Sequence, residues 1–135
     1  MTQEDKEILL KDLCARLPYH PFAYGKSGYA CNEGRLILVT SSGCAIMTGG
    51  GSHVHYFFNE IKLYLRPMSS MTEDEKKELG NFVAASMFAS QNKNPLFKLT
   101  REALIGDFFN KHHFDYRGLI TKGLALEAPK DMYKI

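Results

Sequence analysis

Leucines at helical spacing open the chain. Over residues 2–17 they stand at positions 9, 10, 13 and 17, the spacing of one face of a helix, while charged residues occupy the other side. Thr2 is a suitable N-cap with Asp5 three residues later, and Pro18 ends the helix because the residue before a proline avoids helical backbone angles. Cys14 lies on the flank of the leucine face, so we expect it to be a small buried apolar residue.

Residues 19–66 are divided by glycines into pieces of strand length. The pieces are rich in β-branched and aromatic residues, which favours strands. They are YAC (29–31), LILVT (36–40), CAIMT (44–48), HVHYFF (53–58) and IKLYL (61–65). Asn32-Glu33-Gly34 and Ser41-Ser42-Gly43 are candidate hairpin turns because glycine readily adopts a positive φ. This pattern predicts a meander of four or five antiparallel strands, forming a small sheet or a partly closed barrel.

The change from strand to helix falls between Tyr64 and Leu79. Pro67 ends the last strand of the meander because proline cannot donate to a strand ladder. Thr72 and Glu75 have the spacing of a capping box, which predicts a helix that runs to about Ser90. Its expected buried stripe consists of Leu79, Phe82, Val83, Ser86 and Met87.

The last third of the chain contains further helical signals and one strand signal. Gln91–Pro95 is predicted as a polar loop, and a helix is expected from about Thr100 to Lys111. Asp115 is expected to cap a short turn that Gly123 closes, before a final strand at 124–126. We therefore predict one α+β domain over residues 1–135, mainly β in 19–66 and mainly α in 72–123. It comprises an N-terminal helix, the sheet or partly closed barrel, two to three C-terminal helices and the short final strand.

Composition limits the classes of function. The 135 residues are 44% apolar and 24% charged, which is ordinary for a globular domain. The net charge of +2 is spread evenly, with +1 in residues 1–68 and +1 in residues 69–135, unlike a strongly basic nucleic-acid domain. Three cysteines without a CxxC pair argue against a disulfide framework or a thiolate zinc site.

Targeting signals are also missing from the sequence. The start, MTQEDKEILL, has no basic region followed by an apolar segment, so no signal peptide is predicted. The apolar runs are far shorter than the roughly 20 residues that span a bilayer. We expect a cytoplasmic protein that has no membrane association and needs no cofactor.

Three segments resemble a known group of proteins. YLRPMSSMTEDEKKEL (64–79), NKHHFDYRGLITKGLALEAP (110–129) and KDLCARLPY (11–19) cover about a third of the chain. They are similar to segments of small uncharacterised proteins from gut anaerobic bacteria and their prophages or mobile elements. The resemblance implies a cytoplasmic accessory protein and brings no catalytic residue with it.

The histidines are candidate metal ligands. His53 and His55 alternate on a predicted strand and so share one face; together with His20 or the His112–His113 pair they form a candidate ligand set. No HExxH or similar spacing is present. The simpler interpretation is that these are edge-strand residues and residues at a helix end, where the helix dipole favours histidine.

The densest polar cluster consists of His112, His113, Asp115, Tyr116 and Arg117, of which His113, Asp115 and Arg117 are the candidate site residues. Asp115 orienting a histidine is an arrangement used in acid–base catalysis. The simpler interpretation is structural: Asp115 caps a turn, its aromatic neighbours pack, and Arg117 pairs with a carboxylate of another element. The glycine run TGGGS (48–52) is interpreted as a hairpin tip, because strand signals flank it and no P-loop lysine follows.

Aromatic and basic residues in the β region suggest single-stranded nucleic-acid binding on the sheet as an alternative function. Stacking rings beside positive charge are the features such proteins use. The candidate residues are Tyr24, Lys26, Tyr29, Arg35, Tyr56, Lys62 and Arg66. The weak net charge counts against this alternative.

The leading hypothesis is a non-enzymatic accessory or binding module that acts through a protein partner. It follows from the absence of a coherent catalytic set and from the resemblance. A His-based metal-dependent enzyme is the second alternative. An exposed edge strand would also permit a homodimer.

Overall fold

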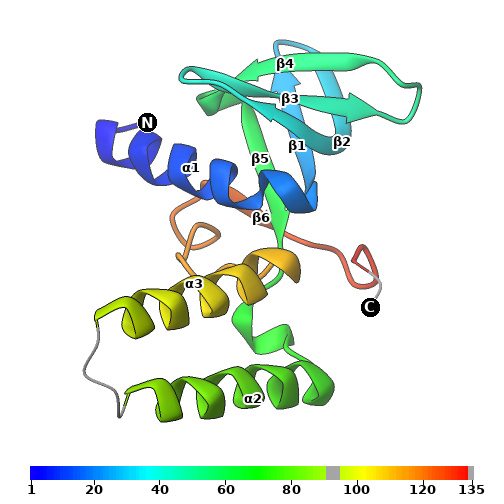
Figure 1. Cartoon of the computed structure of the whole chain (residues 1–135). Helices are drawn as coiled ribbons and strands as arrows, with labels where there is room; N and C mark the ends of the chain where they lie inside the picture. Colours follow the sequence, from blue (N-terminus) through cyan, green and yellow to red (C-terminus); the bar gives the residue numbers. More distant parts are fainter. Residues whose placement is uncertain (91–94, 134–135) are drawn as a thin grey trace.

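The computed structural model describes residues 1–90 and 95–133, without the side chains at position 82 and in 85–90 and 95–102. One helix packs on a mixed sheet, and a pair of helices lies beyond it (Figure 1). The helices are α1 (Gln3–Arg16), α2 (Glu73–Ser90) and α3 (Pro95–Lys111), and the 3-10 turns are η1 (Leu17–Tyr19), η2 (Phe58–Glu60) and η3 (Met68–Ser70). The strands are β1 (Phe22–Ser27), β2 (Ala30–Val39), β3 (Gly43–Thr48), β4 (His53–Phe57), β5 (Ile61–Leu65) and β6 (Ala125–Glu127). The predicted α+β class is confirmed.

The six strands follow the order β4-β3-β2-β1-β5-β6. Neighbouring strands are antiparallel except β5 and β6, which run parallel. The predicted antiparallel meander is confirmed for β2, β3 and β4, but the predicted pieces 29–31 and 36–40 belong to one strand, β2. β1 was not predicted, and β5 returns to pair with it. The sheet is open, with β4 and β6 at its two edges, and is not a barrel.

One predicted turn is wrong and one is confirmed. Asn32-Glu33-Gly34 lies inside β2, and the chain turns instead at Gly28 and Tyr29, where Gly28 has a φ of +61°. Gly34 is needed for another reason, since a Cβ there would collide with the main chain at Met47. Ser41 and Ser42 do form the turn between β2 and β3, as predicted.

The core lies between α1 and the inner face of the sheet. Leu9 and Leu13 of α1 are buried, and the predicted capping box of Thr2 and Asp5 is present. The prediction for Cys14 is wrong, because its thiol is exposed. The buried stripe of α1 consists of positions 9, 12, 13 and 16, and position 14 points away from it.

Curling of the sheet brings β4 over β1. The Tyr56 ring lies against Gly25, where a Cβ would overlap the ring. Tyr56 is buried, and its hydroxyl accepts a hydrogen bond from Asn32 Nδ2 at 2.9 Å. Glycine at position 25 therefore permits the curvature of the sheet.

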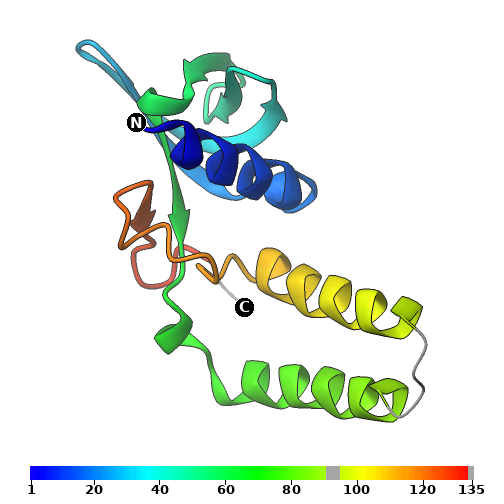
Figure 2. The ribbon, with the colours of Figure 1, turned by 90° about the vertical axis from the view of Figure 1, so that its left-hand side faces the viewer.

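The pair α2 and α3 runs antiparallel on the far side of α1 from the sheet (Figure 2). The predicted capping box is present at the start of α2: Glu75 N–H donates to Thr72 Oγ1 (3.2 Å) and Thr72 N–H to Glu75 Oε1 (2.9 Å). Leu79 and Val83 are half-buried, whereas the side chains at 82, 86 and 87 of the predicted stripe lie outside the described residues, as does the predicted loop at 91–94. α3 begins at Pro95, earlier than predicted. Among the described residues, none of the helices combines the length and apolar character of a membrane span.

Tyr133 closes a gap between β1 and β5. Its hydroxyl accepts a hydrogen bond from Phe22 N–H (2.7 Å) and donates one to the Tyr64 carbonyl (2.8 Å), just where the register between the two strands ends. Burial raises the pKa of Tyr133. The Tyr133 side chain thus links β1 and β5 beyond the point where their backbones pair directly.

Replacing Tyr133 with phenylalanine is expected to lower the free energy of unfolding by about 1–3 kcal/mol, because two backbone groups lose their partner while the ring stays. Urea denaturation measures the change. Tyr29→Phe is the control, since Tyr29 is fully exposed and its replacement should have no effect. Equal stability of the Tyr133 variant and the native chain would contradict this role of the hydroxyl.

Candidate functional site

The outer edge of β4 is the candidate functional site. The hydrogen bond from Thr48 N–H to the Ser52 carbonyl (2.9 Å) shows that these two residues are a hydrogen-bonded pair of the β3–β4 ladder. Because hydrogen-bonded and non-hydrogen-bonded pairs alternate in an antiparallel ladder, Val54 and Tyr56 direct their backbone groups towards β3. The N–H and C=O groups of His53, His55 and Phe57 therefore point outward from the sheet.

Only part of this edge is closed by the fold. Glu60 Oε1 accepts the outward N–H of Phe57 at 3.0 Å. This hydrogen bond and a second one from Ser27 lower the pKa of Glu60. Among the described residues, none pairs with the outward backbone groups of His53 and His55. Two residues of β4 thus present free donors and acceptors, the arrangement that accepts an additional strand.

The side chains of β4 do not oppose pairing with another strand. The strand contains no Lys, Arg, Asp or Glu, the residues with which edge strands usually prevent pairing. His53, His55 and Phe57 are exposed on the outer face, and 65% of the Phe57 surface is accessible. Met47 of β3 is exposed opposite His53. The prediction that His53 and His55 share one face of their strand is therefore confirmed.

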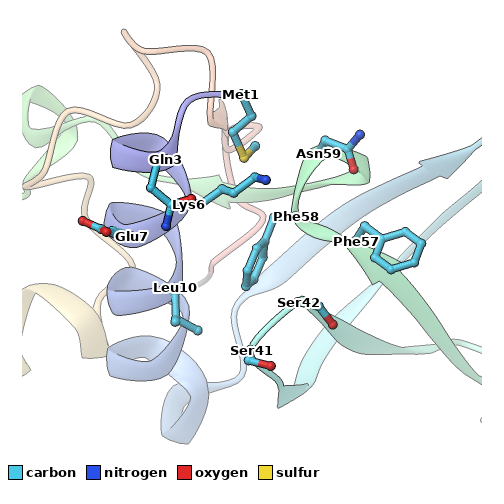
Figure 3. A pocket seen from close by; sticks show the side chains of 10 residues that line it. All are labelled: Met1, Gln3, Lys6, Glu7, Leu10, Ser41, Ser42, Phe57, Phe58 and Asn59. Atoms are coloured by element: carbon cyan, nitrogen blue, oxygen red, sulfur yellow. The ribbon is translucent and has the colours of Figure 1, made fainter.

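A groove lies at the end of this edge, between the start of α1, the β2–β3 turn and η2 (Figure 3). Its volume is about 570 Å³, within the range of ligand-binding clefts. Leu10 and the buried Phe58 supply apolar walls, and Lys6 and Glu7 lie on the helix side. The lining residues are Met1, Gln3, Lys6, Glu7, Leu10, Ser41, Ser42, Phe57, Phe58 and Asn59. Since Phe57 belongs both to the edge and to the groove, the two form one continuous surface.

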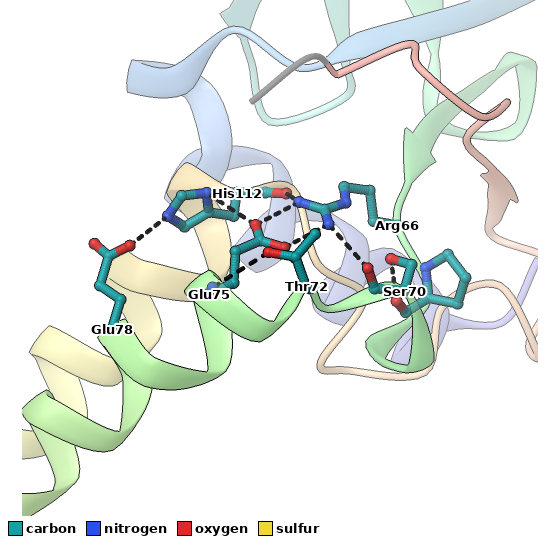
Figure 4. A network of polar contacts seen from close by, with 7 residues as sticks. Arg66, Ser70, Thr72, Glu75, Glu78 and His112 are labelled. Carbon is teal, nitrogen blue, oxygen red and sulfur yellow. Dashed lines mark hydrogen bonds and ion pairs between the residues drawn. The ribbon is translucent and has the colours of Figure 1, made fainter.

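Arg66 belongs to the framework of the fold rather than to its surface (Figure 4). Its guanidinium binds Glu75 through two hydrogen bonds of 2.7 Å, and it also donates to the carbonyls of Ser70 and His112. It lies 4.2 Å from the centre of the Phe114 ring. These contacts join the end of β5 to the start of α2 and the end of α3.

Glu75 is ionised within this network. Burial alone would raise its pKa, but the hydrogen bonds from Arg66 and Thr72 and the charge of Arg66 outweigh burial and hold the pKa at about 2. His112 Nδ1 lies 3.3 Å from Glu75 Oε2, and its Nε2 lies 3.6 Å from Glu78 Oε2. These contacts show that Arg66, Glu75 and His112 hold the end of β5, the start of α2 and the end of α3 together.

The histidines do not converge. His53 and His55 lie on β4 at one edge of the sheet, whereas His112 and His113 directly follow α3. In residues 1–90 and 95–133, no three His, Cys, Asp or Glu side chains are arranged to hold a metal ion. His113 occupies the left-handed position (φ 63°) that ends α3, with Phe114 N–H bonded back to the Phe109 carbonyl.

The polar cluster around Asp115 is also used by the fold. Asp115 accepts the backbone N–H groups of Leu119 and Ile120 at 2.8 and 3.0 Å, so the predicted cap is confirmed. Arg117 Nε lies 3.5 Å from Asp12 Oδ1 on α1, which confirms the predicted pairing with a carboxylate of another element. None of the described residues places a carboxylate against the His113 ring.

The candidate nucleic-acid residues separate into two groups. Tyr24 and Lys62 lie opposite each other in the β1–β5 register, Lys26 is exposed further along β1, and Tyr29 is fully exposed at the hairpin tip. Arg35 is exposed, with its guanidinium 4.2 Å from the centre of the Phe22 ring. In contrast, Tyr56 and Arg66 are buried. Nucleic-acid binding on this face stays a prediction for the exposed group.

Comparisons of the chain with protein-family models, with curated proteins and with solved structures find no match. Function must therefore be inferred from the geometry of this chain. The open edge of β4 was not among the residues that the sequence singled out for a protein partner. The signal for it was the uncharged run from His53 to Phe57, whose position at a sheet edge depends on the strand order.

Proposed function

We propose that the chain is a non-enzymatic binding module that acts through a protein partner, and that an extended segment of the partner adds to the sheet beside β4. The open edge carries this proposal: the outward backbone groups of His53 and His55 have no partner among the described residues, in a strand without Lys, Arg, Asp or Glu. Added strands bind through main-chain hydrogen bonds and gain specificity from pockets for alternate side chains.

The groove beside Phe57 supports the same mode of binding. A partner strand that follows β4 towards Phe57 reaches the groove, where an apolar side chain can contact Leu10 and Phe58. The buried ionisable groups support a non-enzymatic role, since Glu75, Asp12 and Asp115 are all held by the fold. The accessory role in a phage or mobile element and the cytoplasmic location stay predictions.

The test uses random peptides displayed on phage and selected against the native chain. His55→Pro removes the outward N–H while leaving the ladder between β3 and β4 intact. Selected peptides are expected to bind the native chain and His55→Ala, and to lose binding to His55→Pro. Phe57→Ser should weaken the same peptides. Selected peptides that bind His55→Pro as well as the native chain would exclude strand addition at β4.

A second copy of the chain could occupy the same edge. In an antiparallel pair centred on Val54, His53 of each copy would face His55 of the other, so the free groups would match. Light scattering distinguishes this arrangement: a dimer that His55→Pro converts to a monomer would make the second copy the partner. A monomer that binds the selected peptides assigns the edge to another protein.

A further inference from the structure

A second hollow lies between β1 and β2, the end of α3 and the C-terminal segment. Its volume is about 500 Å³. The lining residues are Phe22, Arg35, Arg66, Lys111, His112, His113, Asp131, Met132 and Tyr133. It shares no residue with β4 or with the groove beside Phe57.

Positive charge predominates in this hollow. Arg35 and Lys111 are exposed and contribute full charges, and Asp131 is the acidic residue among the lining side chains. The charge of Arg66 is balanced by Glu75. An anion entering the hollow would therefore meet a net positive charge with hydrogen-bond donors on two sides.

His113 has one buried ring nitrogen, Nδ1, without a hydrogen-bond partner among the described residues, which leaves Nε2 as the nitrogen available to a ligand. Only 9% of the residue is accessible, the ring is stacked on Tyr133 with centres 3.9 Å apart, and none of the described residues hydrogen-bonds to it. Because Nδ1 is buried without an acceptor, the neutral ring is expected to carry its proton on Nε2. Burial and the nearby charges of Arg16 and Arg35 lower the pKa of His113 to about 4, so the ring is neutral at pH 7. It can then donate one hydrogen bond to a ligand oxygen.

An apolar hollow adjoins the basic one. Its volume is about 730 Å³, and its lining includes Ile37 and Met47. The two hollows share Phe22, Arg35 and Met132. The Arg35 guanidinium, which lies over the Phe22 ring and donates to the His20 carbonyl (3.0 Å), is thus held at their junction.

We propose that the two hollows together bind a small organic phosphate. The phosphate group would lie in the basic hollow against Arg35, Lys111 and His113, and the apolar or aromatic body of the ligand would lie on Phe22 and Met47. Arginine and lysine side chains with a neutral N–H donor are a common set for phosphate oxygens. Concave sites with apolar walls and a few convergent polar groups are typical of small-molecule binding.

Calorimetric titration of the whole chain tests the proposal with three probes: inorganic phosphate, adenosine 5′-monophosphate and octyl phosphate. One of the two organic phosphates is expected to bind more tightly than inorganic phosphate, and the tighter one reveals whether the body is aromatic or aliphatic. Arg35→Gln and Lys111→Gln should each weaken binding by about tenfold, the effect of one charge-assisted hydrogen bond. Both residues are exposed, so the variants are expected to fold.

Lys122→Gln is the matched control. It removes one exposed positive charge without touching either hollow, and it should leave binding of the small probes unchanged. Two results would overturn the proposal. One is no heat of binding from any probe at about 10 mM. The other is an equal loss of affinity in Lys122→Gln and Arg35→Gln, which would indicate general attraction of anions to the surface.

Discussion

Replacing Arg66 with methionine is expected to lower the free energy of unfolding by about 3–5 kcal/mol, the cost of breaking a buried ion pair from one side. Glu75 is 2% accessible, and without Arg66 its charge would remain buried with only His112 and the cap of α2 around it. The carbonyls of Ser70 and His112 would lose a donor as well. Urea denaturation followed by circular dichroism measures the loss.

Two further variants make this test specific. Lys76→Met breaks the exposed pair with Glu73 at the start of the same helix and should cost less than about 1 kcal/mol. Adding Glu75→Leu to Arg66→Met should recover part of the loss, because no unpaired charge remains. A loss in Arg66→Met no larger than that in Lys76→Met would contradict the importance of the buried pair.

The same pair makes stability depend on pH. The pKa of Glu75 is about 2 in the folded chain, below its ordinary value of 4.5. A carboxyl whose pKa is lowered by folding stabilises the fold above its ordinary pKa, and this stabilisation is lost as the pH falls through the folded value. The native chain should therefore lose stability between pH 4.5 and about 2, and the Arg66→Met variant should lose less in that interval.

Removal of Arg16 is the second change with a large expected effect. Arg16 and Asp12 are both inaccessible; Arg16 Nε binds Asp12 Oδ2 at 2.8 Å, and its Nη2 binds the Phe114 carbonyl at 2.7 Å. Arg16→Met would leave Asp12 buried with Arg117 Nε at 3.5 Å as its remaining charged neighbour. We expect a loss of about 3–5 kcal/mol in the free energy of unfolding.

Lys11→Met is the matched control for this variant, because Lys11 lies on the exposed side of the same helix and its loss should have little effect. Arg16→Lys should fall between the two, since one ammonium group cannot reproduce the arginine contacts to both Asp12 and Phe114. Equal stabilities of Arg16→Met and Lys11→Met in urea would show that the buried pair contributes nothing.

Local signals in the sequence predicted several helix and strand ends, although β1 was missed and α3 begins at Pro95 rather than near Thr100. The Thr2–Asp5 and Thr72–Glu75 caps, the Pro67 strand end and the Asp115 turn all depend on residues within five positions of each other. Such contacts can be inferred from spacing because the local backbone fixes their geometry. The exposed thiol of Cys14 shows the limit, since one step of about 100° around a helix separates a buried position from an exposed one.

Contacts between distant segments could not be inferred in the same way. Gly34 was interpreted as a turn residue, whereas it stands in β2 because the main chain of Met47 approaches it closely. The parallel pairing of β6 with β5 joins residues about sixty positions apart. The sequence singled out Arg66 for a functional test, but its partners come from α2 and the end of α3. The openness of the β4 edge likewise depends on the order of all six strands.

Gly25 has a consequence for evolution of the binding edge. Any side chain at this position would meet the Tyr56 ring, which belongs to β4. A ring that turned aside would lose the hydrogen bond from Asn32 Nδ2, which links β4 to β2. The identity of a glycine inside the sheet thus affects how firmly the proposed binding edge is held, although a strand added beside β4 would not touch that glycine.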